Sequence, residues 1–424
     1  MIRFLLKGLL RDKSRSRLPI IVVAIGVMLT VFMHAYITGF MGDTIEMNAN
    51  FANGHVKIMT KAYAENMDQM PNDLALMETD QLLEELTSQF GSVDWAPRIR
   101  FGGLLDVPDE QGETRSQGPV FGLGLNFLSG DSREAERLNI DHVLVRGQRL
   151  TQPGEALISE LFSQKMHINP GDTVTLIGST MNGSMAFYNF TVAGTLSFGS
   201  EALDRGALLV DLEDARFALD MQDAAGEIIG FQSEGYYNDA TALAMSERFN
   251  QKHANADDEF APVMKSLSQQ GSMGLYVSMA KYWSVYISLI FVLTMGLVLW
   301  NAGLLGSLRR YGEFGVRLAM GEAKDHVFIT LIYEAMAIGM IGTIIGTAFG
   351  LLFAWLLQTY GLNISGMMEG ASLMMPSTIR ARITAESYYL GFIPGLLSTV
   401  AGTMLAGIGI YRRQTSQLFK ELET

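Results

Sequence analysis

Four long stretches that are almost free of charged residues constrain this chain more than any other feature of its sequence. Each is at least as long as the roughly 20 apolar residues that cross a lipid bilayer. Apolar residues lie all round each stretch, so lipid or other helices must cover every face. Buried helices of a soluble enzyme rarely run this long without a charge. We therefore predict an integral membrane protein whose spans lie at residues 18–42, 281–308, 326–357 and 387–411.

A secretory signal peptide is the alternative interpretation of the first stretch, because basic residues precede it. Its apolar core, Ile20 to Phe40, is longer than the roughly 7–15 residues of a signal core, and no A-x-A-like cleavage site follows. We therefore expect an uncleaved span. The preceding residues 1–17 fit an amphipathic helix in the cytoplasmic interface, and simple anchoring by positive charge fits the same residues.

Lysine and arginine in the short connecting segments predict the orientation, since they favour the cytoplasmic side of a membrane. Thirteen of them lie before the first span, between the second and third spans, and after the fourth, whereas the loop between the third and fourth spans has Arg380 and Arg382. Both termini, the segment 309–325 and the tail 412–424 are therefore expected in the cytoplasm. The remaining segments, 43–280 and 358–386, are expected outside.

The predicted outer segment is strongly acidic. Residues 41–280 contain 35 Asp and Glu against 15 Lys and Arg, and the whole chain has a formal net charge of −13. This balance argues against binding of nucleic acid, whose phosphates require a basic surface. The chain has no cysteine, so an exported domain of this size must fold on its apolar core without disulfides.

Strand and helix patterns alternate along the outer segment. Part-alternating, β-branched runs predict strands at residues 54–59, 173–178, 187–196 and 206–211. Helical spacing predicts helices at residues 79–90, 159–166, 212–221 and 239–252. The stretch from Phe260 to Lys281 is expected to be a helical stalk that continues into the second span. The predicted fold class is a membrane all-α protein with four transmembrane helices and a large α+β extracytoplasmic domain inserted between the first and second helices.

Several catalytic and nucleotide-binding motifs are absent from the sequence. It contains no G-x-x-x-x-G-K-[ST] phosphate loop, no H-E-x-x-H zinc motif and no cysteine cluster, and its six histidines are scattered. We therefore predict that the chain is not an enzyme, that it has no catalytic residue or metal site, and that it does not bind ATP itself.

The segment 309–325, between the second and third spans, is short, charged and rich in glycine. Its charged residues fall on one side of a short helix, and they include Arg309, Arg310, Glu313 and Arg317. Glu313 and Arg317 are four residues apart, so they can pair with each other or with a partner protein. Its glycines are expected to break the helix and to allow another surface to approach closely; they are Gly312, Gly315 and Gly321. A positive-inside loop without further role is the simpler interpretation.

The same segment carries a short motif of arginine, glutamate, aromatic and glycine residues, and a glutamate follows within the third span. These residues are Arg310, Glu313, Phe314, Gly315, Arg317, Gly321, Ala323 and Glu334. They resemble the signature of the FtsX/MacB/LolC-LolE superfamily of ABC-transporter permeases, although the interval from Arg317 to Gly321 is one residue longer than usual. The order of one span, a large outer domain and three spans is similar as well. GHVKI after the first span and INPGDTVTLIG at residues 168–178 are similar to the lipoprotein-release branch.

This resemblance implies a dimeric permease of the bacterial inner membrane, in which a second copy or a paralogue completes the dimer. Two cytoplasmic ABC ATPase subunits would bind ATP and Mg²⁺, and this chain would bind no cofactor. Residues 309–321 would form the helix that couples to the ATPase, and the coupling residues would be Arg309, Arg310, Glu313, Phe314, Gly315, Arg317 and Gly321. ATP-driven closure of the ATPases would then move the spans and transmit force to the outer domain, a mechanism called mechanotransmission.

Three further features lie in or beside the third span. Glu334 is an intramembrane carboxylate, and it is either functional or bonded near the interface to the coupling region. A ladder of small residues, Gly342, Gly346 and Gly350, predicts close packing of helices rather than a role in transport. The methionine pairs Met367-Met368 and Met374-Met375 are read as adaptable apolar surface, and a Cu(I) site is the alternative.

The sequence leaves three functions open. The first is extraction of an amphiphilic substrate, such as a lipoprotein, from the outer leaflet of the inner membrane. The second is an FtsX-like device that switches a periplasmic cell-wall hydrolase and moves no substrate. The third is a MacB-like tripartite efflux permease for drugs or peptides. The candidate outer partners are accordingly a periplasmic adaptor, an acceptor or a lipoprotein substrate. An outer segment of about 240 residues is larger than a minimal relay requires, which favours transport.

Overall fold

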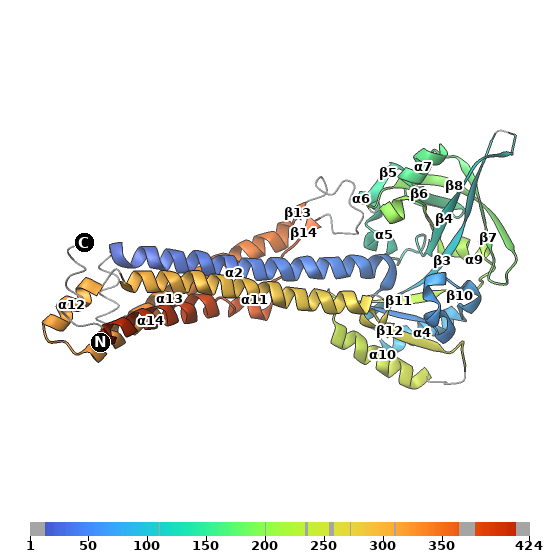
Figure 1. Ribbon diagram of the computed structural model, residues 1–424. Coiled ribbons are helices and arrows are strands. Elements are labelled where there is room, and N and C mark those ends of the chain that lie inside the picture. Colours follow the sequence, from blue (N-terminus) through green and yellow to red (C-terminus); the bar gives the residue numbers. More distant parts are fainter. Residues whose placement is uncertain are drawn as a thin grey trace. The chain divides into compact units, whose positions relative to one another are not determined.

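The computed structural model describes residues 13–109, 111–199, 201–233, 236–253, 258–271, 273–308, 311–363 and 378–412. These residues form two compact units, a helical unit and an outer unit (Figure 1). The helical unit contains the described residues up to Met41, from Met279 to Asn363, and from Thr378 onward. The outer unit contains the described residues from Gly42 to Ser278.

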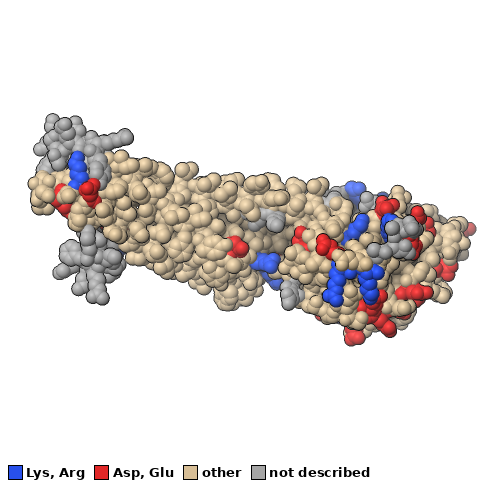
Figure 2. Space-filling model, turned by 90° about the horizontal axis from the view of Figure 1, so that it is seen from below, with Lys and Arg blue, Asp and Glu red and all other residues tan. Residues whose placement is uncertain are grey.

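Within the described residues, four helical segments are long and apolar enough to cross a membrane. They are built from α2 (Lys13–Asn48), α11 (Met273–Leu308), α13 (Lys324–Tyr360) and α14 (Thr399–Arg412), the last preceded by the π-helix η7 (Ile393–Ser398). Large apolar side chains on these helices are exposed, and the helical surface in Figure 2 is nearly free of charged residues. The four predicted membrane helices are confirmed.

The helices differ in detail from the predicted spans. At 36 residues each, α2 and α11 are about 54 Å long, which exceeds the roughly 30 Å of a hydrocarbon core. Both continue from the helical unit into the outer unit. Residues 13–17 belong to α2, so this described part of the expected N-terminal helix is continuous with the first span, while residues 1–12 lie outside the description. The fourth span is partly π-helical, and Gly391 and Gly395 in this region pack tightly against neighbouring helices.

A closed β-barrel forms one lobe of the outer unit. Among the described residues, six strands pair in a ring, each hydrogen-bonded to the next. In order around the barrel these strands are β3 (Val93–Pro108), β4 (Thr114–Leu125), β9 (Ala207–Asp211), β6 (Glu155–Ser159), β8 (Met185–Leu196) and β7 (Thr173–Ser179). Inward-facing apolar residues such as Phe101, Leu176 and Phe190 fill its interior. Figure 1 shows the β3–β4 hairpin projecting from this lobe.

The second lobe is a layer of strands covered by helices. β12 (Pro262–Ser266), β1 (Val56–Thr60), β11 (Glu227–Gln232) and the first part of β3 pair in that order. The helices α4 (Thr79–Gln89) and α10 (Asp239–His253) enclose an apolar core with these strands. β3 therefore belongs to both lobes, and its residue Arg98 pairs in register with Glu227 of β11 and with Leu125 of β4.

The remaining elements are short. They are η1 (Ala49–Asn53), α3 (Lys61–Glu65), η2 (Met67–Gln69), η3 (Asn72–Leu74), β2 (Leu76–Met77), α5 (Glu134–Arg137), α6 (Ile140–Val143), β5 (Leu144–Gly147), α7 (Glu160–Met166), α8 (Glu201–Asp204), α9 (Leu212–Ala218), β10 (Ala224–Ala225), η4 (Leu267–Gln269), α12 (Tyr311–Ala319), β13 (Leu362–Asn363), β14 (Thr378–Ile379) and η6 (Ala385–Tyr388). The α+β prediction is confirmed, as are the eight predicted outer strands and helices. The predicted stalk is wrong in its first part, because β12 and η4 occupy residues 262–269 and α11 begins at Met273.

Candidate functional site

A short helix, α12, separates α11 from α13 in the segment that resembles a coupling helix. Its Phe314 is 1% exposed and packs against Val327 and Leu331 on the first turns of α13. Leu318, one turn further along α12, packs against the same cluster. These apolar contacts fold α12 back on α13 and fix which of its faces is left outward.

The end of α12 is a Schellman motif. The backbone N–H of Glu322 donates to the carbonyl of Arg317, and the N–H of Gly321 donates to the carbonyl of Leu318. Gly321 has a φ of +88°, a left-handed conformation that glycine adopts without strain. This glycine therefore ends the helix, as the sequence predicted. Gly312 and Gly315 lie inside α12 and do not break it, so that part of the prediction is wrong.

An ion-pair network joins the two helices just beyond this turn. The Arg317 guanidinium donates two hydrogen bonds of 2.6 Å, from Nε to Oε2 and from Nη2 to Oε1 of Glu322. The Nδ1 atom of His326 lies 2.6 Å from the same Oε1. The bond from Arg317, with a smaller effect of His326, lowers the pKa of Glu322 to about 2. The carboxylate is therefore ionised near neutral pH.

The structure gives Arg317 a partner that the sequence did not predict. Arg317 pairs with Glu322, five residues away, rather than being left for the expected pair with Glu313. Glu322 and His326 were missed, although their i, i+4 spacing at the start of α13, just after Gly321, was a usable sign. Arg309 and Arg310 lie outside the described residues.

The outward face of α12 is apolar at its centre. Val316 is 41% exposed and Met320 is 76% exposed, and Ala319 lies beside them on the helix. Apolar residues exposed on a short helix, next to an ordered arginine–glutamate pair, form a surface suited to docking of another protein.

The glycine ladder of α13 packs against α2 within the helical unit. A Cβ atom at Gly342 would lie 2.7 Å from the Val23 side chain, and one at Gly346 would lie 2.5 Å from the Ala24 carbonyl. At Gly350 it would lie 2.9 Å from the Met28 carbonyl. The two helices thus approach too closely for any side chain there. Glu334, eight residues before Gly342, is half-buried on the same helix.

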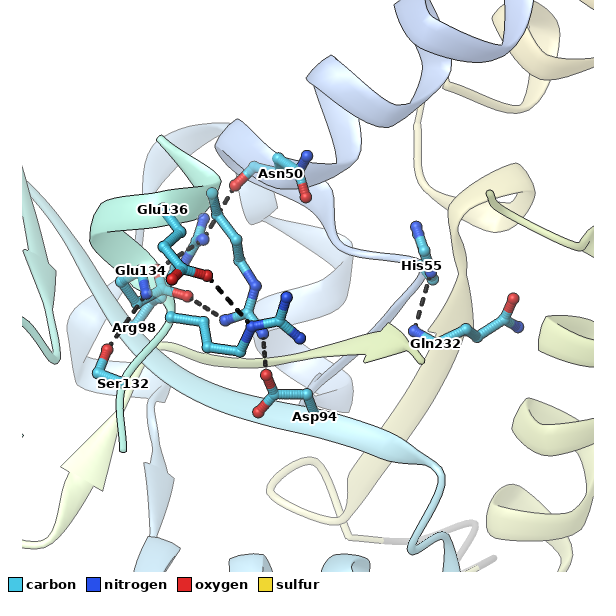
Figure 3. A network of polar contacts seen from close by, with 10 residues as sticks. Asn50, His55, Asp94, Arg98, Ser132, Glu134, Glu136 and Gln232 are labelled. Atoms are coloured by element: carbon cyan, nitrogen blue, oxygen red, sulfur yellow. Dashed lines mark hydrogen bonds and ion pairs between the residues drawn. The ribbon is translucent and has the colours of Figure 1, made fainter. Parts of the chain in front are cut away.

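A buried network surrounds the C-terminal end of α2 in the outer unit (Figure 3). The Arg98 side chain is fully buried, and its guanidinium donates to the carbonyls of Phe51 at 2.7 Å and Asn50 at 2.9 Å. The same guanidinium lies 2.7 Å from the carboxylate of Glu134. Glu134 also accepts a hydrogen bond of 2.6 Å from Arg137, which in turn pairs with Asp94.

Lys57 makes a second buried contact at the same helix end. Its Nζ atom donates to the carbonyl of Ala52 at 2.9 Å and lies 2.7 Å from Glu227, and both side chains are fully buried. Burial lowers the pKa of Lys57 and of Arg98, and the neighbouring carboxylates oppose this shift. Lys57 is the lone basic residue of an otherwise mainly apolar strand, which is a local sign of a paired, buried charge.

In the part of the chain that the structure describes, no group of three or more His, Cys, Asp or Glu residues is placed to hold a metal ion. The methionine pairs of the last outer loop lie outside the description.

Comparison with known protein families assigns the chain to a family. A model of the MacB-like periplasmic core domain matches residues 18–242, which is more than half of the chain. A model of the FtsX-like permease C-terminal region matches residues 285–415. The chain belongs to the FtsX/MacB superfamily of ABC-transporter permeases. Among solved structures, the periplasmic region of MacB from Actinobacillus actinomycetemcomitans is similar at 15% identity and a TM-score of 0.34, over 51% of this chain and 89% of that one. A comparison with curated proteins finds no match.

Both parts of the candidate site lie in the regions that match the FtsX/MacB superfamily. The FtsX-like region contains α12, the Arg317–Glu322 pair, Glu334 and the glycine ladder of α13. The MacB-like region contains the network of Arg98 and Lys57 at the end of α2. This member of the FtsX/MacB superfamily thus has one ordered polar network on its α11–α13 connection and another around residues 50–57, just after the end of α2.

Proposed function

We propose that this chain is the permease subunit of an ABC transporter in a bacterial inner membrane. It works with a separate cytoplasmic ATPase, which binds ATP and Mg²⁺, and with a second permease copy or a paralogue. The observation that carries this proposal is α12, which is held on α13 by Phe314 and presents Val316 and Met320 outward.

The coupling role of α12 follows from how it is held. Phe314 and the Arg317–Glu322 pair fix the helix at its buried face and at its end, so a push on the outward face is delivered to the first turns of α13. Glu313, Gly315 and Gly321 belong to the same proposed coupling surface, together with Arg309 and Arg310. ATP binding shifts the permease only if the ATPase binds two of its states differently.

The proposed substrate is an amphiphile such as a lipoprotein. An apolar row on the outer wall of the barrel supports this class. Leu104 lies opposite Pro119 and Ile177 on the neighbouring strands, and Ile177 lies opposite Phe187. Residues that lie directly opposite point to one face, and Leu104 is 41% and Phe187 63% exposed. An acidic domain that exposes such a row has a surface suited to an apolar group.

Reconstitution tests this function. The chain, its ATPase and any second permease encoded beside it are placed in proteoliposomes with a triacylated lipoprotein, and lipoprotein in the soluble fraction is measured. We expect release that requires both ATP and the ATPase, and no ATP hydrolysis by the chain alone. Phe187→Ser should lower release without changing ATPase binding, whereas Leu161→Ser, at an exposed position on α7, should not.

Three results would contradict parts of the proposal. Turnover of ATP by the purified chain would end the permease assignment. An ATPase complex that releases no lipoprotein but activates a cell-wall hydrolase would replace transport by regulation. Release of drugs or peptides in place of lipoprotein would indicate an efflux permease.

A further inference from the structure

We propose that Arg98 and Lys57 form a clamp on the last carbonyls of the first-span helix, and that force from that helix reaches the barrel through this clamp. The proposal rests on the proposed permease function and adds to it the residues that transmit the movement. Arg98 acts here as a positioning residue, because it holds the helix end and touches no substrate.

The chemistry of a helix end explains why cations are needed there. The last carbonyls of a helix have no donor further along the helix, and they carry the negative end of its dipole. After α2, the π-helix η1 ends at Gly54, whose N–H donates to Ala49 at 2.7 Å. The three carbonyls that follow Ala49 accept instead from two buried cations, those of Asn50 and Phe51 from Arg98 and that of Ala52 from Lys57.

The charges of the clamp are balanced inside the domain. Glu134 neutralises Arg98 and Glu227 neutralises Lys57, and all four side chains are at most 1% exposed. A buried ion pair that loses one partner leaves an uncompensated charge. Departure of the helix end would leave both buried cations without their carbonyl acceptors, which costs free energy, so the clamp resists opening.

The position of Arg98 links the clamp to both lobes. In β3 it is the residue that pairs with β11 on one side and with β4 on the other. A displacement of the helix end is thus delivered to the point where the layered lobe and the barrel share a strand.

Further contacts within the outer unit hold the last turns of α2, from Gly42 onward, on the layered lobe. Nδ1 of His55 accepts from the backbone N–H of Gln232, so Nε2 carries the proton and donates to Glu46 of α2 at 3.0 Å. The other oxygen of Glu46 accepts from the N–H of Tyr237. The ring of Phe51 packs edge-on against Phe198 near the barrel. These contacts orient the helix, and the clamp holds its end.

The experiment removes the clamp without leaving a buried charge. In the full chain in nanodiscs, Arg98→Met is combined with Glu134→Gln, and in a second variant Lys57→Met is combined with Glu227→Gln. The control is Arg216→Met with Glu213→Gln, an arginine–glutamate pair of which only the arginine is buried. Arg216 is also buried and donates to a carbonyl, that of Ala224, but it lies on α9 away from α2. Arg98→Lys serves as the conservative variant.

Hydrogen exchange gives the first readout and needs no ATPase. We expect the amides of Gly54 and His55 to exchange at least about tenfold faster in both clamp variants, with barrel amides unchanged. Arg98→Lys should fall in between, because one ammonium replaces a two-armed fork. The control should leave these amides at the wild-type rate. Equal exchange in wild type and clamp variants would overturn the clamp, and so would equal acceleration in the control.

The second readout measures whether movement is transmitted, as a change in the distance between two spin labels. The chain has no cysteine, so spin labels at Ser184→Cys on the barrel and Tyr360→Cys on α13 are unique. With the ATPase bound, the label–label distance should change on trapping with ATP in wild type and control. The clamp variants should lose most of that change while ATPase binding and basal hydrolysis persist. A wild-type change that persists in the clamp variants overturns force transmission through the clamp. A wild-type chain with no ATPase partner fails the proposed function, and the exchange readout still decides the clamp.

Discussion

Glu322 accepts hydrogen bonds from Arg317 on one side and contacts His326 on the other, so one carboxylate joins the end of α12 to the first turn of α13. Its pKa of about 2 keeps the carboxylate ionised near neutral pH. The pair is partly exposed, and such pairs contribute little to stability. Its value lies in fixing the direction in which α12 presents its outward face.

Replacement of Arg317 by Glu tests this arrangement. The new carboxylate would stand against Glu322 where a bidentate pair now lies, and truncation or reversal of a charge at a desolvated interface costs roughly 2–5 kcal/mol. We expect normal membrane insertion and at least about a tenfold loss of ATPase association, measured by co-purification and by ATPase stimulation. Arg133→Glu, an exposed change in the outer unit, is the control. Full coupling in Arg317→Glu would reduce this segment to a positive-inside loop.

Residues were predicted where a charge pattern is local and missed where the chain folds over a distance. Arg317 was found because it shares a helix with Glu313. Arg98 was not, because its carbonyl partners, Phe51 and Asn50, lie 47 and 48 residues away. Lys57 has a carbonyl partner only five residues away, but the carboxylate that balances its charge, that of Glu227, lies on a distant strand.

At the scale of elements, the small residues of α13 allow it to pack closely against α2. Its glycines at positions 342, 346 and 350 face α2, and Val23, Val27 and Val31 of that helix fill the space that side chains would occupy. Lipid offers no hydrophobic driving force for helix association. Close van der Waals packing of this kind therefore supplies much of the stability of the α2–α13 contact.

Gly346→Ala should therefore destabilise the helical unit. A Cβ there would lie 2.5 Å from the Ala24 carbonyl, and overpacking of a tight contact costs roughly 1–3 kcal/mol. Gly306→Ala in α11 is the control, because a Cβ there meets open space among the described residues and alanine favours helix. Unfolding in graded detergent measures the two variants. Equal stability of both would show that the ladder does not hold α13 on α2.

The missed elements have a physical explanation. β3 and β4 are the two strands that bind the outer unit together, yet they are rich in glycine, which has low strand propensity. Two glycines of β4 make room inside the barrel: a Cβ at Gly122 would lie 2.1 Å from the Phe101 ring, and one at Gly118 would lie 2.9 Å from Phe162. The four predicted strands, β1, β7, β8 and β9, were found because their local pattern agrees with their environment, whereas β11 was missed although it contains Ile228 and Ile229.

At the scale of the whole molecule, composition and charge predicted the layout that the family comparison supports. Long apolar helices and an inserted α+β domain follow from hydropathy and periodicity, and these were confirmed. Substrate class did not follow, because it depends on which outward side chains the barrel brings into one row, and that row is assembled from four strands.

The orientation of the whole chain in the membrane can be tested directly. Single cysteines at Gly112, on the β3–β4 hairpin, and at Met320, at the end of α12, can be probed in intact spheroplasts with an impermeant thiol reagent. The lysine and arginine bias predicts labelling at position 112 and protection at position 320. The opposite pattern would place α12 outside and invert the assignment of every segment.

The sharing of β3 between two lobes has a consequence for how such proteins can be recombined. A barrel that ended in a linker could be exchanged between relatives as a cassette. Here the chain enters the barrel in the middle of a strand, next to Arg98, so any graft must be joined inside a hydrogen-bonded ladder and must bring or keep the arginine. Sequence and length variation between relatives should therefore concentrate in the tips of the β3–β4 and β7–β8 hairpins, where an insertion interrupts no strand pairing between the lobes. The paired parts of the strands should instead be inherited together with the end of α2.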